Sequence, residues 1–401
     1  MIASRLADLP EYAFPRLRAL LAPHPMGGGA EVAMSIGEPR HPFPAWAAAL
    51  LVEAPQSYAK YPPIDGTPDW REAVTGWIQG RFGAALDPDR EVLPVSGTRE
   101  ALFMAAQALV DPETNGRRTA VLLPNPFYQC YAAAALNAGA EPVFVPATEE
   151  TGWLPDFASV SKDVLDRTGF AFWCSPSNPQ GAVADEARIA GVLELAERHG
   201  FTVCFDEPYS EIWRDAPPPG ALGVVRGGGF DSERALVMNS LSKRSSAAGL
   251  RSGFVAGGPR TIEAVKRLRA YAGAPSPLPV LAAAAALWRD EAHVDESRAL
   301  YQAKYALADE VLGGLPGYHP PEAGFFLWLG VEDGEAATVR LWREAGVKVL
   351  PGAYLGRGDP RFLGGANPGT RFVRAALVEP VDAIRPGLEA IAALLGEGDR
   401  P

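Results

Sequence analysis

Short runs of apolar residues alternate with longer amphipathic segments through the first two thirds of the chain. Short apolar runs bounded by turn residues are typical of strands buried on both faces. Such runs predict strands at residues 92–95, 119–123, 142–145, 169–174, 201–205 and 235–238. Helices are expected between them, at residues 70–81, 98–110, 127–137 and 185–199. This βα alternation predicts an α/β fold with a largely parallel sheet covered by helices on both faces.

The pattern changes in the last third of the chain. A further strand at residues 253–256 and a helix through Arg269 precede a long helical region at residues 279–312. The rest reads as α+β, with strands at 325–329, 347–350 and 371–377 and helices at 336–345 and 381–395. A short helix at 6–21 and a strand at 33–36 are expected near the start. We therefore expect an N-terminal segment (1–45) packing with the small domain, a large domain (46–279) and a small C-terminal α+β domain (280–401).

Composition narrows the class of protein. The chain has 401 residues, 47% of them hydrophobic, which is enough for a substantial core. Its net charge of −11 and its lack of a Lys/Arg-rich run argue against nucleic acid and anionic membranes as partners. No apolar stretch is long enough to span a membrane, and the first residues do not resemble a signal peptide. The three cysteines lie in apolar contexts and the five histidines lack metal-ligand spacing, so we expect a cytoplasmic protein without a metal site.

Polar clusters follow five of the expected strands. They are 96–98 (Ser-Gly-Thr), 124–128, 175–181, 206–209 and 240–243. Ligands of α/β proteins bind outside the carboxyl ends of the strands, so these clusters predict a binding site. Taken singly, each has an ordinary structural reading. Ser96 or Thr98 could simply cap a helix, and Asn178 could form an Asx-turn.

Lys243 is the centre of the most distinctive cluster. Ser240 lies three residues before it and Arg251 eight residues after it. Hydroxyl and guanidinium groups beside one lysine could hold a phosphate next to an amine, which is the arrangement that binds pyridoxal phosphate through a Schiff base. A solvated basic loop is the alternative for this stretch alone.

Together, the five clusters in this order and spacing resemble the fold-type I pyridoxal-phosphate enzymes, specifically the aspartate-aminotransferase-like class I/II family. The resemblance extends from Gly37 to Arg374. It implies a large domain with a mostly parallel seven-stranded sheet between helices, plus a smaller α+β domain. It also implies pyridoxal 5′-phosphate as cofactor, and a homodimer with shared active sites that takes small amino and keto acids.

The resemblance also assigns catalytic roles. Lys243 would bond to the cofactor and later shuttle a proton, while Asp206 would face the pyridine nitrogen and keep it protonated. Tyr209 and Asn178 would hydrogen-bond the phenolic oxygen of the cofactor. Tyr128 would stack on the ring.

A second group of residues would hold the cofactor phosphate and the substrate. Ser240 and Arg251 would bind the phosphate, joined by the helix N-terminus at Gly97, Thr98 and Arg99. Arg374 would clamp the substrate α-carboxylate beside Gly37 and Asn178. Tyr61, in the proline-rich loop 58–69, would reach the cofactor phosphate of a second subunit.

Two stretches, 125–131 and 240–254, are similar to those of bacterial succinyldiaminopimelate aminotransferases. A long, doubly acidic substrate needs a distal cation, and Arg99, Arg244 and Arg40 are candidates by composition. One departure from the family pattern is Gln180, where threonine is commoner.

We therefore expect transamination of N-succinyl-LL-2,6-diaminopimelate with 2-oxoglutarate. Another class I/II aminotransferase (aspartate, alanine or aromatic type) and a pyridoxal-phosphate-dependent C–S β-lyase are alternatives within the same fold. An aminotransferase-like effector domain of a regulator is the non-enzymatic alternative. It would require an added DNA-binding module, for which the pattern leaves no room.

Overall fold

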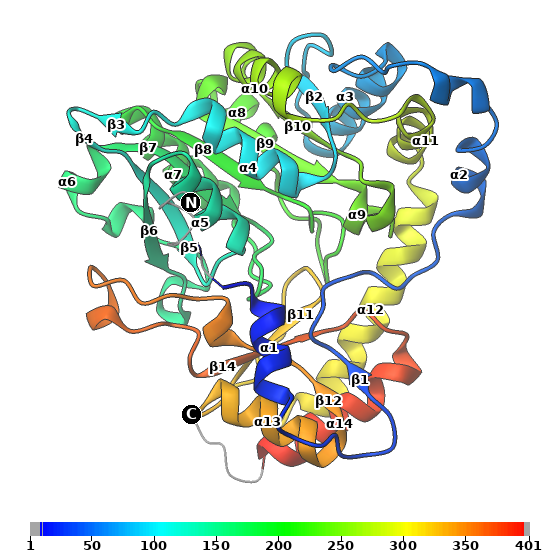
Figure 1. Cartoon of the computed structure of the whole chain (residues 1–401), viewed down its shortest axis with the longest axis vertical. Helices are drawn as coiled ribbons and strands as arrows, with labels where there is room; N and C mark the ends of the chain where they lie inside the picture. Colours follow the sequence, from blue (N-terminus) through cyan, green and yellow to red (C-terminus); the bar gives the residue numbers. More distant parts are fainter. Residues whose placement is uncertain (1–8, 10, 397–401) are drawn as a thin grey trace, which may run out of the picture.

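The computed structural model describes residue 9 and residues 11–396. Its largest element is a seven-stranded sheet with the order β2-β10-β9-β8-β7-β5-β6 (Figure 1). Only β10 runs antiparallel to its neighbours, and every other pair is parallel. The strands are β2 (Val92–Val95), β5 (Ala120–Asn125), β6 (Glu141–Pro146), β7 (Thr168–Cys174), β8 (Thr202–Asp206), β9 (Ala235–Ser240) and β10 (Gly253–Gly257). The mostly parallel seven-stranded sheet is thus present.

Helices cover both faces of this large sheet, which explains why its strands are apolar at nearly every position. Along β7, Ala171 and Trp173 belong to one packed layer, whereas Phe170 and Phe172 belong to the layer on the opposite face. The flanking helices are α3 (Pro68–Phe82), α4 (Thr98–Leu109), α5 (Gln129–Asn137), α7 (Glu186–His199), α8 (Ala221–Gly228), α10 (Pro259–Ala272) and α11 (Leu278–Arg289). The sheet therefore forms the middle of a three-layer sandwich.

A second, smaller sheet with its own apolar core lies below the large one in Figure 1. Its antiparallel strands are β11 (Phe326–Gly330), β14 (Phe372–Ala376) and β13 (Leu350–Pro351). The long helix α12 (Ala292–Leu312) runs down to it from the large sheet, and α13 (Gly334–Ala345) and α14 (Val381–Gly396) pack beside it. This part has the expected α+β character.

The N-terminal segment belongs in space with this smaller part. Helix α1 (Ala13–Leu21) packs against α13, and β1 (Val32–Ala33) pairs in parallel with β12 (Val347–Lys348). Both elements are shorter than the expected helix 6–21 and strand 33–36. Residues 6–8 and 10 of that expected helix lie outside the described residues.

Several short elements were not expected. They are the helices α2 (Ala45–Leu50), α6 (Lys162–Leu165) and α9 (Leu241–Arg244) and a hairpin of β3 (Glu113–Thr114) with β4 (Arg117–Arg118). The most consequential is α9, because it turns the expected loop around Lys243 into one helical turn. Ser240 caps that turn by accepting a hydrogen bond from the Ser242 amide at 3.1 Å. Among the described helices, none is both long and apolar enough to cross a membrane.

Candidate active site

A cavity of about 490 Å³ lies between the carboxyl ends of the large-sheet strands and the small sheet. Most of the residues singled out in the sequence line it together: Gly37, Thr98, Arg99, Tyr128, Asn178, Asp206, Tyr209, Ser240, Lys243, Arg251 and Arg374. Tyr61 does not line it, and its side chain is fully exposed. The chain therefore brings residues from seven separate segments to one place, as the convergence of strand ends predicts.

Lys243 projects into this cavity from α9. Its Nζ donates a hydrogen bond to the Gly37 carbonyl at 2.5 Å. Burial lowers the pKa of the amine to about 8, with Glu38 opposing the shift and the charges of Arg374, Arg251 and Arg99 adding to it. A larger fraction of the amine is thus neutral, and nucleophilic, near physiological pH.

Asp206 ends β8 at the bottom of the cavity. Its Oδ2 accepts a hydrogen bond from the Tyr131 hydroxyl at 2.6 Å, while the buried Oδ1 has no partner among the described residues. Burial raises the pKa of this carboxyl group to about 6, and the Tyr131 bond opposes the rise. An ionised, buried oxygen without a donor is costly, so this side chain is poised to receive one from a ligand.

Tyr131 is a site residue that the sequence analysis missed. It is buried, and its ring stacks on Phe172 at a centroid distance of 4.6 Å. An aromatic residue in an alanine-rich helix is usually interpreted as part of the hydrophobic core. Its spacing from Tyr128 could have indicated a place in the site, because residues three apart lie on the same face of a helix.

The other end of the cavity is built to hold an anion. Arg251 adopts a left-handed backbone (φ 53°) and donates to the Ser96 carbonyl at 2.7 Å and the Ala248 carbonyl at 2.9 Å. Gly97, at φ 86°, precedes the N-terminus of α4, and a Cβ atom there would collide with the Arg251 guanidinium. A helix N-terminus, an arginine and the Ser240 hydroxyl make a suitable phosphate site.

Arg374 is buried on β14, on the small-sheet side of the cavity. It donates to the Asn178 side chain at 3.0 Å and the Ser35 carbonyl at 2.9 Å, and lies 4.0 Å from the Phe326 ring centroid. Burial lowers its pKa to about 10, and the buried Nε has no partner in the described chain. Gly37 packs against Phe326 so closely that a Cβ atom would collide with the ring. This held guanidinium is suited to binding a carboxylate.

Three aromatic hydroxyls and one arginine complete the wall. Tyr209 is buried with its ring edge-on to Phe325, and burial raises its pKa well above the usual value. Arg99 donates to the Tyr128 hydroxyl at 2.5 Å and to the Tyr12 hydroxyl at 3.3 Å. Tyr12 was missed because it was expected inside a helix at 6–21, whereas it directly precedes α1 as its N-cap residue.

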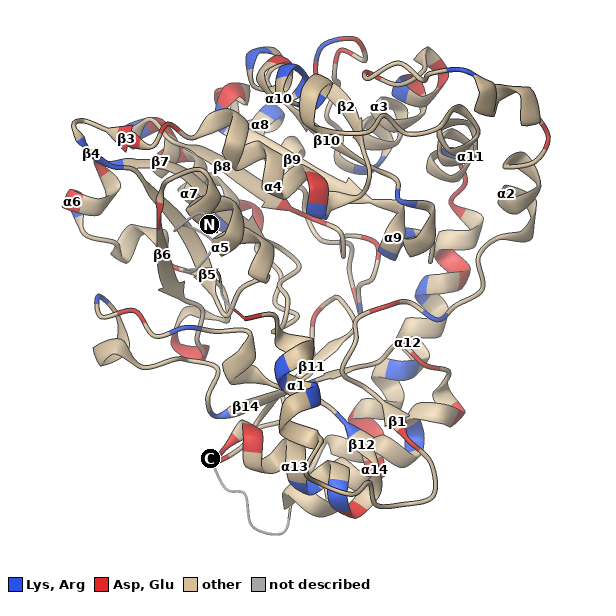
Figure 2. Cartoon of the chain, in the orientation of Figure 1, with Lys and Arg blue, Asp and Glu red and all other residues tan. Residues whose placement is uncertain are grey.

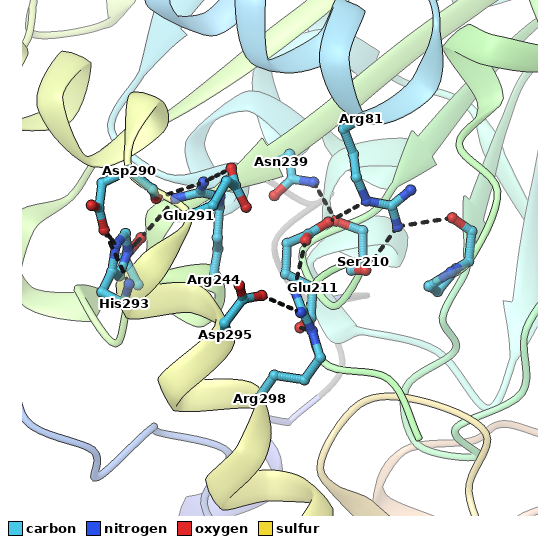
Figure 3. Close-up of polar contacts among 12 residues, drawn as sticks. Arg81, Ser210, Glu211, Asn239, Arg244, Asp290, Glu291, His293, Asp295 and Arg298 are labelled. Carbon is cyan, nitrogen blue, oxygen red and sulfur yellow. Dashed lines mark hydrogen bonds and ion pairs between the residues drawn. The ribbon is translucent and has the colours of Figure 1, made fainter. Parts of the chain in front are cut away.

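Of the three expected distal cations, only Arg99 lines the cavity. Arg40 instead pairs with Glu38 at 3.4 Å and Glu379 at 3.3 Å. Arg244 is fully buried on the opposite side of α9, so the expectation for it is wrong. Figure 3 shows its guanidinium directed toward Asp290 and Glu291, away from the cavity.

Arg244 belongs to a paired polar network behind the lysine. It bonds to Glu291 at 2.5 Å and to the Leu287 carbonyl at 2.7 Å. His293 contacts the Ser245 hydroxyl at 2.8 Å and Asp290 at 2.5 Å (Figure 3). These contacts fasten α9 to the junction between α11 and α12, which fixes the position from which Lys243 projects.

The comparisons with known proteins agree with this geometry. Residues 31–365 match the family model "Aminotransferase class I and II". The chain is 30% identical over 398 residues to an LL-diaminopimelate aminotransferase of Dehalococcoides mccartyi, covering 98% of both sequences.

Two solved structures give the same result. The chain is similar to an aminotransferase from Neisseria meningitidis (TM-score 0.93, 37% identity), covering 98% of this chain and all of that one. It is also similar to a probable N-succinyldiaminopimelate aminotransferase from Thermus thermophilus (TM-score 0.84, 27% identity), covering 96% of this chain and all of that one. The fold-type I architecture expected from the sequence is confirmed.

Proposed function

Because this chain belongs to the class I and II aminotransferases, which depend on pyridoxal phosphate, we propose that it transaminates N-succinyl-LL-2,6-diaminopimelate with 2-oxoglutarate. The observation that carries this proposal is one cavity holding a lysine with a lowered pKa, a buried carboxylate with a free oxygen, and a held arginine. These are Lys243, Asp206 and Arg374.

The residues present fit the cofactor. The unpartnered Oδ1 of Asp206 could accept the N–H of a protonated pyridine ring, which would supply the missing donor. Arg251, Ser240 and the N-terminus of α4 would form the phosphate site, and the lack of a side chain at Gly97 leaves room for the Arg251 guanidinium there. Pyridoxal phosphate, when bound, supplies an aldehyde that condenses with amines and a ring that takes up electrons from the reacting carbon.

The protein's own groups then divide the work. Arg374 binds the substrate α-carboxylate, which aligns the α-carbon with Lys243. Lys243 Nζ, neutral in an appreciable fraction because of its lowered pKa, takes the proton from that carbon and returns it one step later. Asp206 is ionised above its pKa of about 6, and its carboxylate would favour a positive charge on the pyridine nitrogen of the bound cofactor.

The choice of substrate rests on the relatives and on the wall of the cavity. The relatives named above carry the diaminopimelate skeleton in their names, in free and in succinylated form. Arg99 provides a cation beside Tyr128 and Tyr12 for a carboxylate far from the reacting amine. LL-diaminopimelate itself is the second candidate, favoured by the 30% identical relative.

We also propose that the active unit is a homodimer. The support is an exposed group of large side chains around the proline-rich loop, including Trp46, Val52, Tyr58 and Tyr61. The Tyr61 side chain is fully exposed in its own chain, and a second copy would bury it. Mixing inactive Tyr61→Phe and Lys243→Ala variants tests this, because hybrid dimers then contain one intact site. Absence of any regained activity would contradict a shared site.

The deciding experiment is a spectral titration of the cofactor-loaded protein with single amino donors: glutamate, N-succinyl-LL-diaminopimelate, LL-diaminopimelate, aspartate and alanine. Conversion to the amine form by glutamate and the succinylated donor supports the proposal. Conversion by LL-diaminopimelate but not by its succinyl derivative would select the second candidate. Pyruvate and ammonia from cystathionine without conversion would indicate a β-lyase.

A further inference from the structure

Arg357 lies in the loop that follows β13, and it differs from the other half-buried arginines. In the part of the chain that the structure describes, its guanidinium alone among them has neither a carboxylate nor a carbonyl partner. The others are all paired with an acid: Arg16, Arg71, Arg81, Arg167, Arg214, Arg234, Arg298, Arg340 and Arg385. A partly desolvated cation without a counter-charge is unfavourable, which calls for an explanation.

The backbone around Arg357 is firmly held. Its amide donates to the Asn125 side chain at 3.0 Å, and the same side chain donates back to the Arg357 carbonyl at 2.7 Å. Asn125 is buried at the end of β5, so the loop is anchored to the large sheet. Asn367 holds the preceding residue by donating to the Gly356 carbonyl at 3.1 Å. The free guanidinium is therefore presented from a fixed position.

This position adjoins the cavity. Leu355, two residues before Arg357, lines the cavity, and its carbonyl accepts from the Phe127 amide at 2.8 Å. Ala13, at the start of α1, also lines the cavity, and Arg16 lies one helical turn beyond it. The loop and α1 thus both reach the edge of the cavity, with Arg357 and Arg16 just outside the residues that line it.

Arg16 adds a second positive charge there. Its guanidinium lies 3.8 Å from the ring centroid of Tyr354, next to Leu355. Burial, reinforced by the charge of Arg16, lowers the pKa of Arg357. Arg16 reaches its own acid, Glu335, only at 3.8 Å and in a half-exposed pair. In Figure 2, basic residues are visible on α1 beside this loop. Arg357, with no acid partner in the described chain and with the charge of Arg16 nearby, is therefore suited to bind an anion.

We infer that Arg357, assisted by Arg16, binds a carboxylate of the substrate that lies far from the reacting amine. This inference rests on the proposed function. It specifies that the distal carboxylate is the part of the substrate that Arg357 and Arg16 bind. Arg374 and Arg99 are inside the cavity, so a carboxylate at the rim is an additional one, carried by a longer molecule.

The rim charges discriminate between the two candidate substrates. Succinylation of diaminopimelate replaces a distal ammonium group with a neutral amide and adds a terminal carboxylate. Free LL-diaminopimelate would bring its distal ammonium toward two guanidinium groups, which is repulsive. The same site therefore attracts the acylated donor and disfavours the free one.

The test compares two matched donors on the cofactor-loaded enzyme. N-succinyl- and N-butyryl-LL-diaminopimelate differ only in whether the acyl chain ends in a carboxylate or a methyl group. We expect the unsubstituted enzyme to prefer the succinyl donor in kcat/KM by about tenfold or more, the scale of a charge-assisted hydrogen bond. Arg357→Gln should abolish this preference through KM, and Arg357→Lys should restore part of it. Arg18→Gln, on the same helix as Arg16, is the control that should change nothing.

Each outcome decides between the two claims. Equal use of both donors by the unsubstituted enzyme, or a preference that survives in Arg357→Gln, would overturn the subsite and leave the proposed function standing. Use of neither acylated donor alongside use of LL-diaminopimelate would overturn the proposed substrate and the subsite with it. The glutamate half-reaction should be the same in all variants, because glutamate is too short to reach the rim.

Discussion

The two sides of helix α9 differ in how their charged groups are satisfied. On the back, Arg244 and the acid Glu291 are paired, and His293 bridges Ser245 and Asp290. On the side of α9 that faces the cavity, the Lys243 side chain donates a hydrogen bond to the Gly37 carbonyl and has no acid partner among the described residues. Asp206 has one buried carboxylate oxygen without a partner among the described residues and no acid or base paired with it, and the buried Arg374 has no carboxylate partner there.

The contrast separates the requirements of folding from those of function. Burying a polar group without a partner destabilises the folded protein. The back of α9 limits this cost by pairing Arg244 with an acid and two carbonyls, although its buried Nε has no partner among the described residues. On the cavity side, a bound cofactor and substrate would supply the missing partners. Substitutions on the two sides should therefore affect different quantities, and four of them test this.

The largest effect is expected for Lys243→Ala. Removing the amine eliminates both the bond to the cofactor and the proton carrier, so kcat should fall by at least about a thousandfold. The apoprotein should nevertheless melt at or slightly above the temperature of the unsubstituted protein, because a buried amine with a lowered pKa is lost. Appreciable transamination by Lys243→Ala would contradict the mechanism. Lys162→Ala, which removes an exposed lysine, is the control.

Arg244→Leu should act in the opposite way, through stability. It strips the donors from Glu291 and from the Leu287 and Asp290 carbonyls, so unfolding free energy should fall by about 2–4 kcal/mol. Denaturant titration of the apoprotein measures this. Arg289→Leu removes an exposed pair between the end of α11 and Asp69 of α3, and it should cost less than about 1 kcal/mol. Equal losses in the two variants would remove the distinction between the back of α9 and the surface.

Arg374→Ala should weaken substrate binding by about 1.5–3 kcal/mol, the scale of a charged hydrogen-bonded contact. The effect should be seen in the Michaelis constants of amino and keto acids alike, because both carry the α-carboxylate. Arg374→Lys should recover part of it, since an ammonium group cannot make the forked contact. Unchanged Michaelis constants would mean that the carboxylate binds elsewhere.

The smallest effect is expected for Asp206→Asn, which changes the unfolding free energy and its dependence on pH. The pKa of Asp206 rises on folding to about 6, so the folded state prefers the protonated form and its stability declines as pH rises from about 4 to 6. Asparagine removes this penalty. The variant apoprotein should be about 1–3 kcal/mol more stable than the unsubstituted protein at pH 8, and the difference should vanish near pH 4. A variant destabilised at pH 8 would contradict the assignment.

Much of the fold could be predicted because the large sheet leaves an unambiguous pattern. Strands buried on both faces are apolar throughout, and β2 and β7 lie within one residue of their expected ends. The hairpin β3–β4 was missed because two-residue strands leave no periodicity. The expected division into domains stays a prediction, although two separate apolar cores accompany it.

The site was predictable only where polar residues interrupt apolar strands. Asp206 and Ser240 stand out for that reason, whereas Tyr131 and Tyr12 lie in contexts that hide them. Arg244 misled because adjacent residues on a helical turn point about 100° apart, and a loop was expected there. The roles of the site residues remain predictions that the experiments above address.

The pairing of β1 with β12 has a consequence for synthesis of the protein on the ribosome. The strands of the large sheet, from β2 to β10, are translated as one block and can pair before the rest emerges. Val32 can pair with Val347 only after Val347 has been synthesised. The Met34 carbonyl likewise accepts a hydrogen bond from the amide of Ala376, which is synthesised much later. At bacterial elongation rates this delay is roughly 15–60 s. The Gly37 carbonyl that accepts from Lys243 is therefore placed late, so a nascent chain can complete its binding site only after residues 347–376 have been synthesised.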